Sequence, residues 1–422
     1  MPATARQLTL RALLEWEKGR SFSDEILHTL FERQRLSPLD RAFAMETFFG
    51  TLRNLTRLDF LIDRLREGTL DAATRAVLRL GLYQIFHMRT AAHAAVNETV
   101  ELGGAARGLI NAVLRRALRE KDALDAALDA APLAVRTSHP EFLIERWNAV
   151  FGADATQRLC AWNNLPAEVH VRANCLKVTT GELLRATPEA TQSPAHPLML
   201  KVPHLPFAWI ANGLCYVQDP STLLACDLLD PQPGERVLDA CAGRGQKTSL
   251  LVERVGEGGH VWAADLHRKK LVALGRELVR LHLPSVRTAE VDWTRGTDAV
   301  PGNFDRVLVD APCTGVGTLR RRPEIATRLA ENDPPRLGEL ATGILRGAAL
   351  RARSGGRVVF AVCSVLPEEA EAVVERVSDL LEPAPFDAPE IEKLAPPSAT
   401  AFRLLPLEHG TDGYFVASFV RR

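Results

Sequence analysis

The sequence lacks several features that commonly identify a class of protein. It has no Cys-x-x-Cys pair or other zinc spacing, and its 7 scattered cysteines do not fit a disulfide framework. No stretch reaches the roughly 20 uninterrupted apolar residues of a membrane-spanning helix, and the first residues contain no apolar signal segment. These absences predict a cytoplasmic protein, in a reducing compartment, that holds no metal and enters no membrane.

An excess of charge of one sign is also missing, because Lys plus Arg and Asp plus Glu both number 52. No global electrostatic field therefore indicates nucleic acid, although a neutral protein can still carry a local basic face. Apolar mass is present instead, since 46% of the 422 residues are hydrophobic. A chain of this length and composition predicts two or three domains with cores of their own.

Three regions of different character follow one another along the chain. Residues 1–130 show helical apolar spacing and predict an all-α domain, with the Ala- and Asp-rich stretch 122–132 as its exit linker. Residues 131–217 combine a helix over 141–151 with a strand over 168–174, which predicts a small α+β connector. Residues 218–422 alternate strands and helices, and this pattern predicts a parallel, doubly wound α/β sheet. The strands expected there cover 236–239, 260–264, 285–291, 304–309 and 357–362, with an antiparallel edge over 401–407 and 414–420.

The first strand of the α/β region leads into a turn of small residues that a ligand can approach closely. The turn consists of Cys241, Ala242, Gly243, Arg244, Gly245, Gln246 and Lys247. Glycine after a strand is also ordinary turn chemistry, so the turn alone is weak evidence. Asp265 ends the second strand, where a carboxylate can bind both hydroxyls of a ribose. With Asp292 placed after the third strand to meet an adenine amino group, the pattern predicts an adenosine-containing cofactor, either NAD or S-adenosyl-L-methionine.

Two cysteines distinguish between these cofactors. Cys313 and Cys363 each follow a buried strand, and the carboxyl ends of parallel strands meet at the edge of the sheet where ligands bind. Hydride transfer has no use for two thiols, whereas methylation of C5 of a pyrimidine needs a nucleophile at C6 and a second acid–base group near the ring. Either cysteine alone would more often be a buried apolar residue, but the combination favours S-adenosylmethionine. Burial remains the interpretation for the other cysteines, Cys160, Cys175, Cys215, Cys226 and Cys241.

Four segments of the α/β region carry a resemblance to a known family: QDPSTLLACDLL over 218–229, DAPCTGVG over 310–317, AVCSVLPEE over 361–369 and DGYFVASF over 412–419. They resemble the bacterial RNA cytosine-5 methyltransferases that modify small-subunit ribosomal RNA and are related to the Nop2/Sun proteins. AVNETVE over 95–101 and GLINAVLR over 108–115 are similar to the NusB-like helical domain of that subgroup, and SHP at 138–140 and VRANCLK at 171–177 to its connector. The resemblance implies a multidomain protein: a NusB-like RNA-binding domain over 1–130, a connector over 131–217, and a Rossmann-like class I methyltransferase domain over 218–422.

The resemblance also implies roles for individual residues. Cys363 would be the nucleophile that attacks C6, Cys313 would help to release the methylated base, and Asp310 would hydrogen-bond the ring between cofactor and target. Asp265 and Asp292 would take the ribose and the adenine, while the turn over 241–247 surrounds the methionine part. A basic run, Arg320, Arg321 and Arg322, would meet phosphates that flank a flipped target base.

One departure from the family concerns the cofactor turn, which is usually Ala-Pro-Gly-Gly-Lys and is Gly-Arg-Gly-Gln-Lys over 243–247 here. Loss of the proline and of one glycine predicts a loop of different shape, or a guanidinium close to the cofactor. We expect an RNA cytosine-5 methyltransferase acting on small-subunit ribosomal RNA. Transfer RNA as the substrate, or a non-catalytic RNA-binding assembly factor, stays open. The sequence names neither the target nucleotide nor the state of the RNA, free or in a pre-ribosomal particle, and leaves the oligomeric state open, with a monomer expected.

Overall fold

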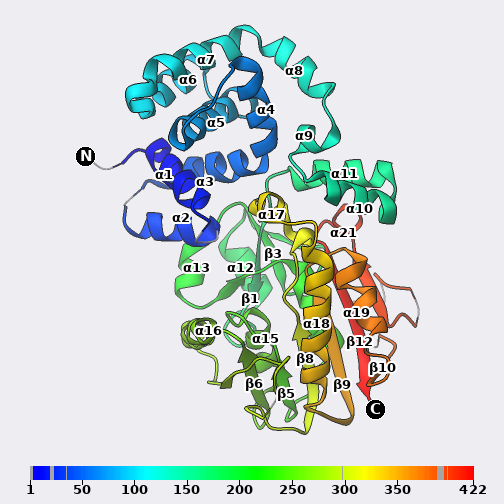
Figure 1. Ribbon diagram of the computed structural model, residues 1–422. Coiled ribbons are helices and arrows are strands. Elements are labelled where there is room, and N and C mark those ends of the chain that lie inside the picture. The colour runs from blue at the N-terminus through cyan, green and yellow to red at the C-terminus, as the bar shows by residue number, and fades with distance from the viewer. Residues whose placement is uncertain (1–2, 20–22, 35, 297, 387–393, 397) are drawn as a thin grey trace. The chain divides into compact units, whose positions relative to one another are not determined.

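The computed structural model describes residues 3–19, 23–34, 36–296, 298–386, 394–396 and 398–422 (Figure 1). Contacts divide the chain into two units, Met1–Pro166 with Leu319–Arg328, and Ala167–Thr318 with Leu329–Arg422. Among these described ranges, no helix has the length and apolarity needed to cross a membrane.

The first unit is helical, and its helices begin where the sequence places capping residues. Ser37 accepts a hydrogen bond from the Asp40 N–H at the helix that opens with Pro38, and Thr4 and Gln7 form a capping box. The elements of this unit are α1 (Ala5–Glu17), α2 (Ser23–Glu32), α3 (Pro38–Arg53), α4 (Leu55–Leu65), α5 (Ala72–His87), α6 (Ala92–Val100), η1 (Glu101–Ala106), α7 (Arg107–Arg119), α8 (Lys121–Asp129), α9 (Leu133–Thr137), α10 (Glu141–Phe151), α11 (Ala153–Asn163) and α17 (Glu324–Arg328).

One expectation for this unit was wrong, because the stretch 122–132 is not a linker. Most of it forms α8, whose Leu124 and Leu128 are buried in the core that α4, α5 and α7 build. These two leucines are four residues apart and so share one helix face. The Ala- and Asp-rich composition concealed this short apolar stripe.

The second unit begins with a four-stranded antiparallel sheet in the order β2-β3-β1-β4. Its strands are β1 (Val169–Ala173), β2 (Thr191–Gln192), β3 (Met199–Val202) and β4 (Cys215–Val217), with helices α12 (Thr180–Ala186) and α13 (Phe207–Ala211). The connector over 131–217 is therefore shared: its helices α10 and α11 belong to the first unit and its sheet to the second. The domain boundaries at 130 and 217 remain predictions.

A larger mixed sheet follows, in the order β10-β12-β9-β8-β5-β6-β7, with β11 paired to β12. The strands β5 to β9 are parallel to their neighbours within this group. The antiparallel edge contains β11 and β12, which the sequence predicts, and also β10, which it does not predict. The strands are β5 (Arg236–Asp239), β6 (His260–Asp265), β7 (Arg287–Glu290), β8 (Phe304–Asp310), β9 (Ala352–Val362), β10 (Leu381–Pro383), β11 (Ala401–Leu404) and β12 (Tyr414–Arg421).

Helices cover both faces of this sheet (Figure 1). Side chains alternate between the faces: Val358 and Phe360 of β9 pack in one core, while Val359 packs in the other. One core includes α14 (Leu224–Leu229), α15 (Gln246–Val255) and α16 (Arg268–Leu281), and the other includes α18 (Asp333–Ala349) and the segment from α19 (Glu371–Glu375) to Val377. The remaining short elements are η2 (Pro220–Leu223), η3 (Val316–Thr318), η4 (Pro367–Glu369) and α21 (Pro406–His409).

The strand order changes direction between β5 and β8. The chain runs outward from β5 through β6 to β7, then returns to place β8 and β9 on the other side of β5. Such a switch point leaves a crevice outside the carboxyl ends of the two central strands, where ligands of open α/β sheets bind. The residues that follow β5, β6, β8 and β9 therefore define the site.

Candidate active site

The turn between β5 and α15 is held by backbone hydrogen bonds. The Ala242 N–H donates to the carbonyl of Ala264 at 2.9 Å, and the Gly245 N–H to the carbonyl of Ala242 at 2.9 Å. Gly243 (φ 56°) and Gly245 (φ 90°) lie in the left-handed region, which glycine adopts at little cost. A Cβ atom at Gly243 would meet no atom within 4 Å, so the backbone there is open to approach by a ligand.

Asp265 lies at the end of β6, directly beside this turn. Its carboxylate accepts the Gly243 N–H at 3.1 Å and the His267 N–H at 2.8 Å, and only 6% of the residue is exposed. Asp292 follows β7, and its carboxylate accepts the N–H and the hydroxyl of Thr294 at 3.1 and 2.6 Å. These hydrogen bonds lower the pKa of Asp292. The structure thus brings both predicted carboxylates to neighbouring strand ends.

Asp310 ends β8, and two side chains from other elements hold its carboxylate. Lys247, in the first turn of α15, donates from Nζ to Oδ2 at 2.5 Å, and Tyr414 of β12 donates its hydroxyl to Oδ1 at 2.8 Å. Lys247 is buried, and this burial lowers its pKa, but the charge of Asp310, the hydrogen bond to Asp310 and the smaller effects of Cys226 and Asp239 together outweigh it, so that the pKa is raised. The ion pair therefore joins the turn after β5 to the end of β8.

The two predicted thiols lie against each other at the ends of β8 and β9. The Sγ atoms of Cys313 and Cys363 are 3.3 Å apart, both cysteines are free, and both are partly exposed. The hydrogen bond with the Cys363 sulfur, and then burial, hold the pKa of the Cys313 thiol well above its ordinary value. Either sulfur can be the donor in this contact.

A buried carboxyl group lies beside the turn between β5 and α15. Asp239, the last residue of β5, accepts the Thr248 hydroxyl on Oδ2 at 2.7 Å, while its Oδ1 has no hydrogen-bond partner among the described residues. Burial raises the pKa of Asp239 to about 7, and the lowering effects of Thr248 and Lys247 are smaller. No separate signal in the sequence marks this residue, since it lies within an ordinary strand.

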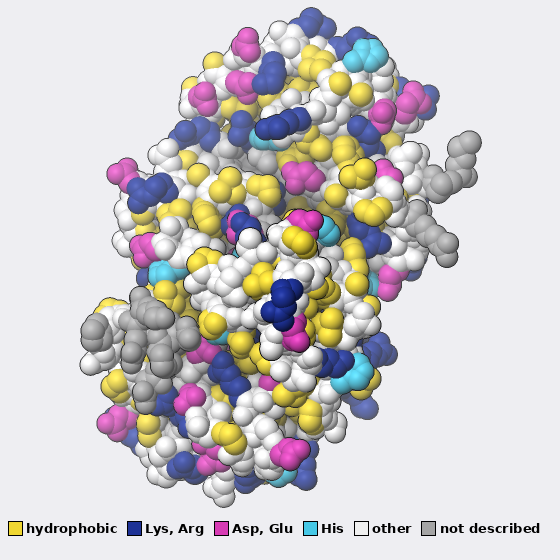
Figure 2. All heavy atoms as spheres, turned by 180° about the vertical axis from the view of Figure 1, so that it is seen from behind, with side chains coloured by type: hydrophobic (Ala, Val, Ile, Leu, Met, Phe, Trp, Pro, Cys, Tyr) yellow, Lys and Arg dark blue, Asp and Glu magenta, His cyan; other side chains and the backbone are white. Residues whose placement is uncertain are grey.

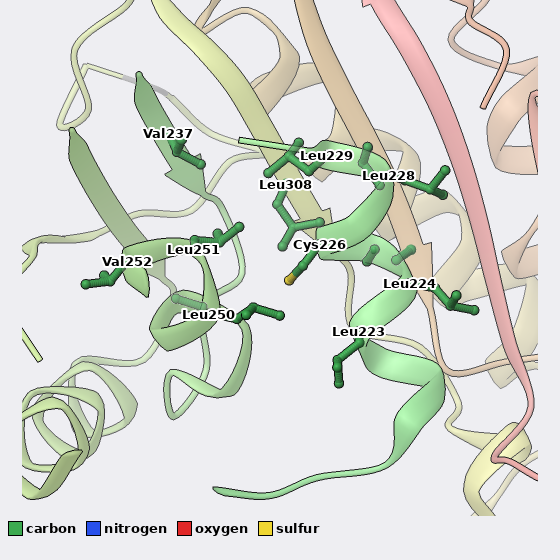
Figure 3. Packing of buried hydrophobic residues seen from close by; sticks show 14 of the residues in the cluster. Leu223, Leu224, Cys226, Leu228, Leu229, Val237, Leu250, Leu251, Val252 and Leu308 are labelled. Carbon is green, nitrogen blue, oxygen red and sulfur yellow. The ribbon is translucent and has the colours of Figure 1, made fainter. Parts of the chain in front are cut away.

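The remaining cysteines have no comparable arrangement. Cys226 of α14 points into the core beside Leu250, Leu251 and Leu308 (Figure 3), and burial raises its pKa to about 12. Burial likewise raises the pKa of Cys215 to about 12 and that of Cys160 to about 11. Cys175 is exposed. A buried, protonated thiol is a small apolar residue rather than a nucleophile, in agreement with the sequence interpretation of Cys226, Cys215 and Cys160.

The basic run after the second thiol segment belongs to the first unit. The Arg320 guanidinium lies 4.4 Å from the ring centre of Trp162 and donates to the carbonyl of Pro166 at 2.7 Å. Arg321 is half-buried and Arg322 is exposed. On the face shown in Figure 2, Lys and Arg side chains lie among Asp and Glu, consistent with the balanced composition. Contact of these arginines with RNA remains a prediction.

Besides Asp239, two more side chains of the site were not anticipated from the sequence. Tyr414 binds Asp310, and Glu369 of η4 binds the residues that follow both thiols. Both contacts join distant elements, so no local pattern announces them, although Glu369 lies within the AVCSVLPEE segment. Across the described ranges, the side chains form no group of three His, Cys, Asp or Glu residues that could hold a metal ion.

Three parts of the chain match known protein families. Residues 226–420 match the family model of the 16S rRNA methyltransferase RsmB/F family. Residues 3–119 match the model of the NusB family, and residues 139–199 match that of the ferredoxin-like domain of the RsmF/B-like methyltransferases. The chain is 30% identical over 446 residues to the probable ribosomal RNA small subunit methyltransferase B of Bacillus subtilis, covering 99% of each chain. It is 32% identical over 433 residues to the ribosomal RNA small subunit methyltransferase B of an Escherichia coli strain, O6:K15:H31, covering 96% of each. A solved methyltransferase homologue from Pyrococcus horikoshii is 25% identical with a TM-score of 0.57, covering 69% of this chain and 97% of that one.

Proposed function

The chain belongs to the 16S rRNA methyltransferase RsmB/F family, and we propose that it methylates C5 of a cytosine in small-subunit ribosomal RNA. The observation that carries this proposal is the pair of thiols after β8 and β9, whose sulfur atoms lie 3.3 Å apart. C5 of cytosine is a poor nucleophile until another group adds to C6, and a thiolate is the side-chain group best suited to that addition. The RNA class comes from the names of the full-length relatives.

S-adenosylmethionine is the proposed methyl donor, and it supplies an electrophilic methyl group when bound. The residues of the first βα turn fit it. Gly243 leaves its backbone open to a ligand. Asp265, which accepts the Gly243 N–H, would bind the ribose hydroxyls, and Asp292 would meet the adenine. The unpartnered Oδ1 of Asp239 is an acceptor that a nearby cation, such as the ammonium group of the methionine part, would stabilise. The segment Cys241–Lys247 would surround this part of the ligand.

Cys363 is the proposed nucleophile. Its sulfur forms a bond with C6 of the cytosine, and the electron pair of the C5–C6 double bond becomes available at C5 for the methyl group. C5 then carries both a methyl group and a proton, and the proton must leave before the bond between sulfur and C6 can break. Loss of that proton restores the double bond and expels the Cys363 sulfur as a thiolate.

Cys313 is the proposed acceptor of the C5 proton. In the resting pair, the hydrogen bond to the Cys363 sulfur is the main cause of its raised pKa. Once the Cys363 sulfur is bonded to carbon, this hydrogen bond and the negative charge are lost. The pKa of Cys313 then falls, so that it can release its own proton to solvent and take the one from C5.

Asp310 is proposed to hydrogen-bond the target base between cofactor and thiols. Lys247 and Tyr414 already fix both oxygens of its carboxylate. A carboxylate held in this way has little freedom to turn, which favours one orientation of the base.

The basic segment is proposed to contact RNA phosphates, together with the helical first unit that matches the NusB family. Arg322 is exposed, and the guanidinium of Arg320 already stacks on Trp162, which fixes its position. Charge-assisted contacts of this kind position an RNA without reading its sequence.

Base-resolution mapping of 5-methylcytosine tests the function directly. Small-subunit ribosomal RNA transcript, assembled 30S particles and transfer RNA are each incubated with the protein and S-adenosylmethionine. We expect one methylated cytosine in the ribosomal RNA. Methylation confined to transfer RNA would show that transfer RNA, and not ribosomal RNA, is the substrate. Cofactor binding without methylation of any RNA would favour a non-catalytic assembly factor.

A further inference from the structure

One buried carboxylate contacts the segments that carry both thiols. Glu369 lies in η4, and its Oε1 accepts the backbone N–H of Thr314 at 2.6 Å. Its Oε2 accepts the Thr314 hydroxyl at 2.6 Å and the Ser364 hydroxyl at 2.5 Å. Thr314 directly follows Cys313, and Ser364 directly follows Cys363. A single side chain is therefore hydrogen-bonded next to each reactive sulfur.

The contacts around Glu369 leave its carboxylate little freedom. The residue is 1% exposed, and burial raises its pKa above the ordinary value. The Ser364 hydroxyl that donates to it also accepts the Leu366 N–H at 3.2 Å, which closes the loop between Cys363 and η4. Behind η4, a Cβ atom on Gly338 of α18 would lie 2.0 Å from the carbonyl oxygen of Glu368, so the helix packs directly on this backbone.

The charge of Glu369 also acts on the sulfur atoms. The hydrogen bond with Cys363 is the largest cause of the raised pKa of Cys313, followed by burial and by the charge of Cys363. The negative charge of Glu369 raises this pKa further. Asp333, at the start of α18, is the further acidic group that acts on Glu369 itself. The titratable groups that bear on this corner of the site thus include both thiols, Glu369 and Asp333, together with Tyr414 of β12, which interacts with Cys363.

We propose that Glu369 is a positioning residue for the two thiols: it fixes the segments after β8 and β9 so that the sulfur atoms stay close enough to share one proton. Its carboxylate touches neither sulfur and acts through Thr314 and Ser364. The consequence for catalysis rests on the proposed methyl transfer, but the consequence for the thiols does not.

The test compares the full chain with Glu369→Gln, which keeps the size of the side chain and removes its charge. Glu375→Gln, at the exposed end of α19, is the matched control. Two thiol reactions are followed by mass spectrometry without RNA or cofactor: alkylation by iodoacetamide across a pH series, and formation of a Cys313–Cys363 disulfide by the oxidant diamide. Buried Cys215 and Cys226 report whether the fold is intact, and exposed Cys175 gives the rate of an accessible thiol outside the site.

In Glu369→Gln, we expect disulfide formation to slow about tenfold. Alkylation of Cys313 should speed up roughly tenfold, which corresponds to a fall of about one unit in the pKa of its thiol. Cys215 and Cys226 should stay unreactive, and Glu375→Gln should match the wild type. These opposite changes distinguish lost positioning from general loosening, which would expose every buried thiol. Unchanged rates for both reactions in a folded Glu369→Gln protein would overturn the proposal.

If Glu369→Gln exposes Cys226, the partners are changed instead. Ser364→Ala and Thr314→Val each remove one hydroxyl donor, and each should slow disulfide formation by a smaller factor; no change in either would also overturn the proposal. Methylation is then measured, with a lower kcat and an unchanged KM for S-adenosylmethionine expected. A wild-type protein that methylates no RNA would count against the proposed function alone, because the thiol reactions do not depend on it.

Discussion

The carboxyl edge of the large sheet has two halves that are built differently. After β5 and β6, backbone N–H groups and glycines at positive φ surround Asp265, and the turn leaves open space in front of Gly243. After β8 and β9, two sulfur atoms lie 3.3 Å apart beside one buried glutamate. The first half suits a ligand held by backbone and carboxylate. The second holds two side chains against each other, as bond-making chemistry requires.

The ion pair between Lys247 and Asp310 joins the two halves. Lys247 belongs to the helix that follows the cofactor turn, and Asp310 ends the strand that leads to Cys313. Cys241 shows that a cysteine at this edge is not enough. It follows β5 as Cys313 follows β8, but burial is the main cause of its raised pKa, whereas for Cys313 it is the hydrogen bond with a second thiol.

The largest effect is expected in the thiol half. Cys363→Ala removes the proposed nucleophile, so methylation should fall at least about 10³-fold, because the proposed role of the neighbouring Cys313 is to accept the C5 proton and not to add to C6. Binding of S-adenosylmethionine, measured by calorimetry, should be unchanged within about twofold. Cys175→Ala, at an exposed site, is the control and should retain activity. Substantial methylation by Cys363→Ala would remove the distinction between the two halves.

A smaller effect is expected in the cofactor half. Asp265→Ala should weaken S-adenosylmethionine binding about 100-fold, since hydrogen bonds to a charged group contribute roughly 1.5–3 kcal/mol. The rates at which Cys313 and Cys363 are alkylated should not change, because Asp265 touches neither of their sulfur atoms. Glu257→Ala, in the exposed turn after α15, is the control for calorimetry. Unweakened binding in Asp265→Ala would show that the cofactor lies elsewhere.

The smallest effect concerns Asp239 and the pH dependence of stability. Its pKa is about 7 in the folded chain and about 3.8 unfolded, so between these values the folded protein keeps a proton that the unfolded chain releases. Its contribution to the free energy of unfolding therefore falls as pH rises from about 4 to 7. The free energy of unfolding of Asp239→Asn, relative to that of the wild type, should rise by about 1 kcal/mol or more between pH 5 and pH 8, because one pKa unit corresponds to about 1.4 kcal/mol. Denaturation at both pH values measures this, and a pH-independent difference would contradict it.

The sequence predicted the fold well where periodicity is local. The five parallel strands lie where alternation places them, although β9 begins at Ala352, because Ser354, Gly355 and Gly356 interrupt its apolar run. At the antiparallel edge, β12 matches its prediction, whereas β11 ends at Leu404 and β10 was not predicted. The linker prediction over 122–132 failed because two buried leucines in a polar stretch carry little signal. Local composition alone cannot measure how much a short helix buries.

For the site, the sequence predicted which residues lie close together, but it did not predict which side chains form hydrogen bonds with one another. Cys313, Cys363 and Asp265 follow strands, and strand ends of a parallel sheet converge, so their proximity could be predicted. The contacts of Asp310 with Tyr414 and of Thr314 with Glu369 join residues far apart in the chain. They depend on how β12 and η4 pack, which no local pattern specifies.

The most direct test of the division of labour between the two thiols is a covalent-trapping experiment. Cys313→Ala is mixed with S-adenosylmethionine and an unmethylated ribosomal RNA fragment that contains the target cytosine, and the products are separated on a denaturing gel. We expect a stable protein–RNA complex, because the C5 proton is not removed and Cys363 stays bonded to C6. The band should be absent from the double variant that also carries Cys363→Ala. Rapid turnover by Cys313→Ala without any trapped complex would contradict the account.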